Sequence, residues 1–121
     1  MRKRGFGRLV FFGMNGTHVT QPAKLMSLYG AAKAAVVTFA RTLALEEARY
    51  GITVNVIEPG DIRNKTATRE GARLIAADNP TGHAGSWEDV ADAVRFAVRD
   101  ESSFLNGMVL NVNGGLVDPH E

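Results

Sequence analysis

Ile52-Thr53-Val54-Asn55-Val56-Ile57 is the stretch that decides the fold of this chain. Its β-branched residues favour a strand. Gly51, just before it, suits the left-handed conformation that stops a helix, and Glu58-Pro59-Gly60-Asp61 ends the strand sharply. A helix therefore runs directly into this strand, as in an α/β fold.

Toward the N-terminus the sequence predicts a helix, a loop and another strand. The helix covers about 29–50, with Ser27 as its N-cap, and its apolar positions are broad enough for burial on more than one side. Residues 15–27 are read as a loop because they contain glycine, threonine and proline. Leu9-Val10-Phe11-Phe12 is a continuous apolar run, which indicates a buried strand.

Toward the C-terminus a second long helix and a third strand follow. Residues 62–85 are polar and irregular, with a short helix expected near 69–77. Ser86-Trp87-Glu88-Asp89 matches a helix-capping pattern, and Met108-Val109-Leu110-Asn111-Val112 is read as a strand. The order gives two β-α-β units, whose right-handed crossovers make the three strands parallel. We therefore expect an α/β fold containing half of a doubly wound parallel sheet, three parallel strands with crossover helices.

Bulk composition excludes several classes of function. The 121 residues suit one domain, and a net charge of +1 gives no field that would select nucleic acid or a membrane as a partner. No run reaches the ~20 apolar residues that span a bilayer, and no secretory signal is apparent, so a cytoplasmic location is expected. Cysteine is absent and the three histidines are scattered, so neither a disulfide framework nor a metal cluster is expected.

Tyr29 and Lys33 form the candidate chemical pair. Four residues apart on a helix, they lie on the same face, one turn apart. A free tyrosine titrates near pH ~10. A fixed ammonium beside the phenol favours the phenolate form and makes Tyr29 a usable general acid or base.

Five groups of residues carry a family resemblance, in this order: Gly7–Val10; Tyr29–Ala34; Tyr50–Asn55 with Pro59-Gly60; Gly85–Ala91; Ser103–Val109 with Asn113-Gly114-Gly115. With this order and spacing, the chain resembles the C-terminal half of a short-chain dehydrogenase/reductase, and is most similar to the 3-oxoacyl-[acyl-carrier-protein] reductase branch. The resemblance implies a Rossmann-like fold, NAD or NADP as cofactor, and a small-molecule carbonyl or alcohol as substrate. It also implies a homo-oligomer that uses the helix at 29–50.

The resemblance implies roles for single residues. Tyr29 would pass a proton to or from the substrate, and Lys33 would assist it and hold the nicotinamide ribose. Pro59-Gly60 would lie against the nicotinamide, and the backbone of Ile62 would reach its carboxamide. Asn64 would stand where the family often has a threonine that binds the cofactor.

The resemblance also places segment 65–83 on the substrate side. Its Arg69, Arg73 and His83 are read as solvated charges in preference to substrate contacts. No pattern among them names an acyl carrier, a steroid or a sugar.

Besides Asn64, two features depart from the family pattern. The sequence lacks the Gly-rich turn and helix that bind the pyrophosphate, so we expect a single partial domain from which the N-terminal dinucleotide-binding half is absent. The position of the catalytic serine falls on Gly13 and Met14 by strand register, or on Gly16 by helix spacing. Thr17 or Asn15 is then the candidate replacement.

Two functions stay open. One is an NAD(P)-dependent oxidoreductase of this family that interconverts carbonyls and alcohols. The alternative is a truncated, non-catalytic fragment that self-associates and does not bind cofactor. The strand at 9–12 would then present an unpaired apolar edge, which invites pairing with another chain.

Overall fold

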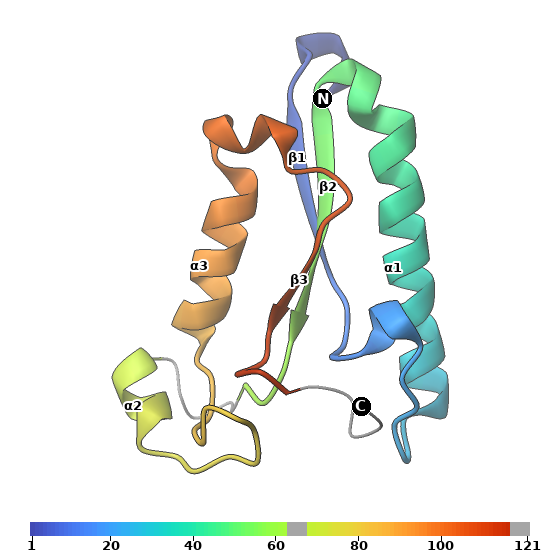
Figure 1. Ribbon diagram of the computed structural model, residues 1–121. Helices are drawn as coiled ribbons and strands as arrows, with labels where there is room; N and C mark the ends of the chain where they lie inside the picture. Colours follow the sequence, from blue (N-terminus) through green and yellow to red (C-terminus); the bar gives the residue numbers. More distant parts are fainter. Residues whose placement is uncertain (63–67, 117–121) are drawn as a thin grey trace.

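A parallel three-stranded sheet lies between two helices in this computed structural model, which describes residues 1–62 and 68–116. Helix α1 runs along one face of the sheet and α3 along the other (Figure 1). The strands are β1 (Gly7–Phe12), β2 (Ile52–Pro59) and β3 (Val109–Val112), and the α-helices are α1 (Ser27–Glu47), α2 (Arg69–Arg73) and α3 (Trp87–Val98). Short 3₁₀ turns complete the chain: η1 (Arg2–Arg4), η2 (Thr17–Val19), η3 (Ala48–Tyr50) and η4 (Asp100–Phe104).

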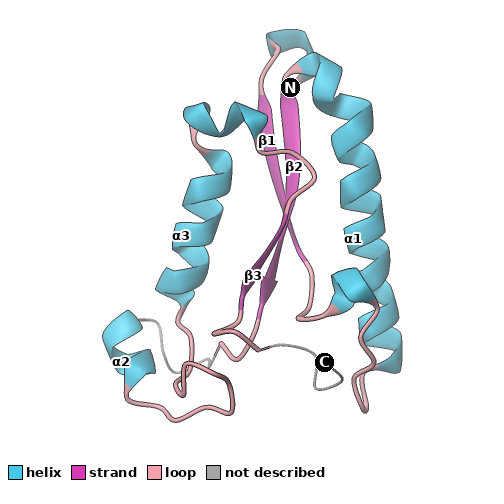
Figure 2. Ribbon diagram, in the orientation of Figure 1, coloured by secondary structure: helices cyan, strands magenta, loops and turns pink. Residues whose placement is uncertain are grey.

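The strand order is β1-β2-β3, and both pairings are parallel. Gly7 pairs with Ile52 at one end of the first ladder, and Pro59 pairs with Val112 at the far end of the second. The carboxyl ends of all three strands therefore meet at one edge (Figure 2), which is where open α/β sheets bind ligands. The expected fold class, three parallel strands with crossover helices, is confirmed.

The core forms where α1 packs on the central strand. Residues two apart on β2 face α1, and the buried cluster consists of Val37, Ala40, Ala44, Ile52, Val54 and Val56. Small alanines on α1 let the helix approach the sheet closely. By length and composition, Ser27–Tyr50 could also cross a membrane, with 24 residues and a hydropathy of 1.2, although no such run was expected from the sequence. In this structure the segment covers one face of a sheet.

Two expectations from the sequence need correction. Ser27 is not the N-cap of α1 but its first residue, because the N–H of Gly30 donates to the carbonyl of Met26 and closes the first turn one residue earlier. Strand β1 is not buried along its length, because it is the edge strand of the sheet, and Phe12 at its end is 42% exposed. The same arrangement leaves β1 with the open edge that the sequence predicted.

The predicted helix stop at Gly51 is confirmed. Its φ of +70° is left-handed, and a Cβ built on it would lie 2.2 Å from the carbonyl oxygen of Gly5. Only glycine meets both conditions without strain.

Candidate active site

Tyr29 and Lys33 lie together at the carboxyl end of β1. The ammonium of Lys33 donates to the carbonyl oxygen of Phe12 at 2.9 Å, and its Nζ is 5.6 Å from the centre of the Tyr29 ring. Tyr29 is 52% exposed, and its hydroxyl makes no hydrogen bond to residues 1–62 or 68–116. The fold thus fixes the cation next to the aromatic ring and leaves the phenol oxygen open to solvent.

The turn after β2 lies against the end of β3. The N–H of Gly60 donates to the carbonyl of Val112 at 3.0 Å, and a Cβ on Gly60 would be 2.7 Å from the Cα of Asn113. The N–H of Ile62 donates back to the carbonyl of Gly60 at 2.9 Å. Close packing between backbones therefore explains this glycine, and the Ile62 N–H already has a partner. Asn64 lies outside the described residues.

An apolar hollow of about 410 Å³ adjoins this turn. It is lined by Phe12, Pro59, Trp87, Val90, Ala91 and Val94. Pro59 and Phe12 end neighbouring strands, and the other residues belong to the first turns of α3. A flat apolar ring is the kind of group that such a surface accommodates.

Both candidate replacements for the family serine make contacts within the protein. The hydroxyl of Thr17 is 2.8 Å from Oε1 of Glu58, and the residue is only 4% exposed. The side-chain oxygen of Asn15 accepts a hydrogen bond from Asn113 at 2.6 Å. The structure therefore commits the Thr17 hydroxyl and the Asn15 side-chain oxygen to contacts within the protein, while the Asn15 NH₂ group makes no hydrogen bond to the described residues.

Glu58 is the residue that the sequence reasoning missed. It is fully buried at the end of β2, where its carboxylate accepts hydrogen bonds from the N–H of Gly16 (3.1 Å), the hydroxyl of Thr17 (2.8 Å), the N–H of His18 (3.0 Å) and Nδ1 of His18 (2.7 Å). The sequence does contain a signal for this residue: a carboxylate follows directly on an apolar strand, and a carboxylate that is buried there needs hydrogen-bond donors around it.

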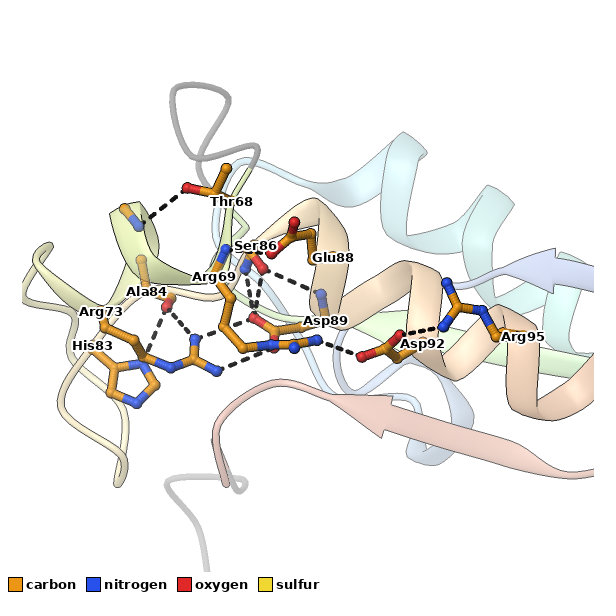
Figure 3. A network of polar contacts seen from close by, with 11 residues as sticks. Thr68, Arg69, Arg73, His83, Ala84, Ser86, Glu88, Asp89, Asp92 and Arg95 are labelled. Atoms are coloured by element: carbon orange, nitrogen blue, oxygen red, sulfur yellow. Dashed lines mark hydrogen bonds and ion pairs between the residues drawn. The ribbon is translucent and has the colours of Figure 1, made fainter.

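Arg69 and Arg73 serve to hold α2 against α3, as Figure 3 shows. Arg69 bonds Asp89 at 2.8 Å and also pairs with Asp92, while Arg73 bonds both carboxylate oxygens of Asp89 at 3.1 Å. Asp89 also completes the predicted capping box with Ser86. Burial of Asp89 acts to raise its pKa, but the hydrogen bonds from Arg73, Arg69 and Ser86 outweigh it and hold that pKa well below its ordinary range.

The described residues suit one end of a dinucleotide better than the other. The apolar hollow beside Pro59 could hold a flat ring, and the exposed Tyr29–Lys33 pair lies at the same carboxyl edge of the sheet, where a ribose could reach it. A pyrophosphate needs free backbone N–H groups at a helix start. The turn from Gly13 to Gly16 offers few such groups, because the N–H groups of Gly13, Met14 and Gly16 already bind Ile57, Thr17 and Glu58.

Comparisons with known proteins identify the family. A family model described as enoyl-(acyl carrier protein) reductase matches residues 1–117. The 3-oxoacyl-[acyl-carrier-protein] reductase FabG of Haemophilus influenzae is 40% identical over 119 residues, which cover 96% of this chain and 48% of that protein. The chain spans about half the length of the curated relatives it matches.

Solved structures give the same result. A Bacillus thuringiensis protein, provisionally named a 3-oxoacyl-reductase, superposes with a TM-score of 0.86 at 35% identity, over 96% of this chain and 47% of that one. A variant of actinorhodin polyketide ketoreductase, solved with NADPH, superposes with a TM-score of 0.78 at 31% identity, over 94% of this chain and 48% of that one. The chain therefore belongs to the short-chain dehydrogenase/reductase family.

Proposed function

We propose that this chain carries the proton-transfer side of an NAD(P)-dependent oxidoreductase that interconverts a small-molecule carbonyl and its alcohol. One observation carries the proposal. The open phenol of Tyr29 stands beside an ammonium that is anchored on the Phe12 carbonyl, at the carboxyl edge of a parallel sheet. Family membership and the apolar hollow beside Pro59 support the same assignment.

In this proposal Tyr29 moves the proton. During reduction its hydroxyl donates to the substrate oxygen as an alkoxide develops, and during alcohol oxidation the same oxygen accepts the proton. Lys33 stabilises the phenolate by its positive charge, and the Phe12 carbonyl keeps the ammonium in place. The dinucleotide, when bound, supplies or accepts the hydride.

The remaining site residues have supporting roles. In this proposal Pro59-Gly60 forms a wall for the nicotinamide and the backbone of Ile62 reaches its carboxamide, while Asn64, outside the described residues, takes the cofactor-binding role of the family's threonine. Thr17 does not take over the serine role, because its hydroxyl is buried against Glu58, whereas the NH₂ group of Asn15 stays the candidate donor to the substrate oxygen. The loss of one oriented donor of this kind lowers a rate by a factor of about 10².

The second candidate function is a non-catalytic fragment that self-associates. The turn after β1, whose Gly16 N–H is already bound by Glu58, favours it because that turn offers little to a pyrophosphate. We propose accordingly that residues 1–121 form a partial domain with negligible affinity for NAD(P)H on their own, and that catalysis needs a nucleotide-binding half.

A chimeric protein tests the first function. The half of Haemophilus influenzae FabG that this chain does not match is joined to the start of the chain, and NADPH-dependent reduction of a β-keto ester is followed by the loss of NADPH absorbance. The Tyr29→Phe chimera should lose a factor of about 10²–10⁴ in kcat, the usual contribution of a positioned proton donor. The matched control is Tyr50→Phe, which removes the same hydroxyl from the 3₁₀ turn η3 that follows α1.

The two functions give different results. An active chimera that depends on Tyr29 supports the oxidoreductase, and equal activity in Tyr29→Phe and Tyr50→Phe refutes the role of Tyr29. A fluorescence titration of the unfused chain with NADPH tests the second function. Micromolar affinity there contradicts the proposal that the chain alone does not bind cofactor.

A further inference from the structure

His18 is held in one orientation by a buried carboxylate. Its Nδ1 lies 2.7 Å from Oε2 of Glu58, whose other contacts hold the backbone of the same turn. A carboxylate can only accept hydrogen bonds, so Nδ1 carries the hydrogen that joins the two groups. The free nitrogen of the ring is therefore Nε2, and the side chain as a whole remains 29% exposed.

The His18 ring borders an open groove of about 510 Å³ between α1 and the turn before β3. Its lining includes His18, Thr38, Arg41, Thr42, Asn106 and Gly107. Thr38 and Thr42 stand one helical turn apart on α1 and add two hydroxyl groups. The groove thus combines an oriented imidazole with further hydrogen-bonding side chains.

Arg41 supplies a positive charge to the same groove. Its guanidinium has no hydrogen bond or ion pair with the residues that the structure describes. By contrast, Arg2 binds Glu47 in a two-pronged pair, and Arg69 and Arg73 bind Asp89. Arg41 is therefore an exposed cation without an ion pair among the described residues, and it lines the same groove as His18.

The groove is distinct from the candidate active site. Ala34, Thr38 and Arg41 form a stripe on α1 about a third of a turn around the helix from Tyr29 and Lys33. Lys33 reaches the open edge of β1, whereas the groove lies toward the turn at Asn106 and Gly107. The helix itself separates the two places.

We infer that this groove is a second binding site, and that it takes a small oxyanion group, a phosphate or a carboxylate. The planar guanidinium of Arg41 provides the paired donors that such groups prefer. His18 in its charged form donates from both nitrogens, to Glu58 on one side and to the oxyanion on the other. The inference does not depend on the proposed function, because neither Tyr29 nor Lys33 takes part in it.

The test is an NMR titration of the ¹⁵N-labelled chain with sodium phosphate, and separately with sodium acetate, at constant ionic strength. Either probe should cause saturable shifts of the His18 ring and Arg41 side-chain signals, and the tighter probe identifies the phosphate or the carboxylate source. Arg41→Gln should weaken binding about tenfold, the contribution of one charge-assisted hydrogen bond. The matched control, Lys24→Gln, removes an exposed cation that does not line the groove and should change little.

Three results overturn the inference. They are the absence of saturable shifts with both probes, an equal loss of affinity in Lys24→Gln and Arg41→Gln, and shifts that centre on Tyr29 and Lys33. Mapping the shifts in the unsubstituted chain locates the site even if a variant folds poorly.

Discussion

Glu58→Gln tests how strongly the buried carboxylate holds the turn from Gly16 to His18. The substitution keeps the side-chain volume, so no cavity is created. The glutamine oxygen can replace Oε1 and keep the bonds from the Thr17 hydroxyl and the His18 N–H. Its NH₂ group then faces the Gly16 N–H and Nδ1 of His18, which are both donors.

Two hydrogen bonds to a charged acceptor are lost in this variant. At about 1.5–3 kcal/mol each, the loss is about 3–6 kcal/mol. The His18 ring is partly exposed and can turn to water, so we expect the lower end, about 3 kcal/mol. The Gly16 N–H has no such escape because the residue is buried.

Urea denaturation followed by the fluorescence of Trp87, the single tryptophan, measures the effect. With a slope of about 1–3 kcal/mol per molar urea, the midpoint should fall by about 1 M or more. Glu101→Gln, at an exposed position, is the control and should stay within about 0.5 kcal/mol of the parent. Equal midpoints for Glu58→Gln and Glu101→Gln would refute the reasoning.

A double-mutant cycle sharpens this test. Thr17→Val removes one of the two donors at Oε1, so the glutamine oxygen of Glu58→Gln can turn toward the Gly16 N–H and Nδ1 of His18. Only the His18 N–H then faces the NH₂ group. The double variant should therefore lose less stability than the sum of the two single variants. Strict additivity would show that the two side chains do not share the acceptor.

Three further predictions concern other parts of the chain. Because the folded pKa of Asp89 is depressed, its stabilising contribution is complete above the ordinary pKa of about 4 and is lost as pH falls toward the folded pKa. In Asp89→Asn the free energy of unfolding should therefore fall less steeply below about pH 4, and an unchanged acid denaturation curve would contradict the pairing with Arg73. Gly51→Ala should lower the free energy of unfolding by about 1–3 kcal/mol because of its left-handed φ, and by a further amount because the new Cβ meets the Gly5 carbonyl. Gly82→Ala has a similar φ but open space around it and should cost less, so equal unfolding free energies for the two variants would contradict the close contact. The open edge of β1 should give light-scattering masses above the 13.0 kDa of one chain, which Phe12→Lys lowers, and a clean monomer for the parent would argue against self-association.

Local patterns predicted the elements of the fold well. The β-branched run at 52–57 became the fully buried central strand, and Gly51 and the Ser86 capping box marked helix ends where expected. These features depend on backbone conformation and on neighbours within four residues, so the sequence contains them directly. The error at Ser27 is of the same local kind, since one short hydrogen bond moved the start of the helix by a residue.

Contacts between distant residues could not be predicted in this way. The four hydrogen bonds of Glu58 join residues about forty positions apart, and they exist because β1 and β2 end side by side. The sequence offered Thr17 as a free hydroxyl near the active site, and the fold instead turned it toward Glu58. The exposure of β1 likewise follows from its place in the sheet and not from its composition.

The most direct test of the central claim is the single-turnover rate of hydride transfer in the NADPH-loaded chimera, with binding measured separately. Tyr29→Phe should leave the NADPH affinity within about twofold and slow the chemical step by a factor of about 10² or more, because only the proton donor is removed. An unchanged chemical step in Tyr29→Phe would contradict the account, whatever the stability of the variant.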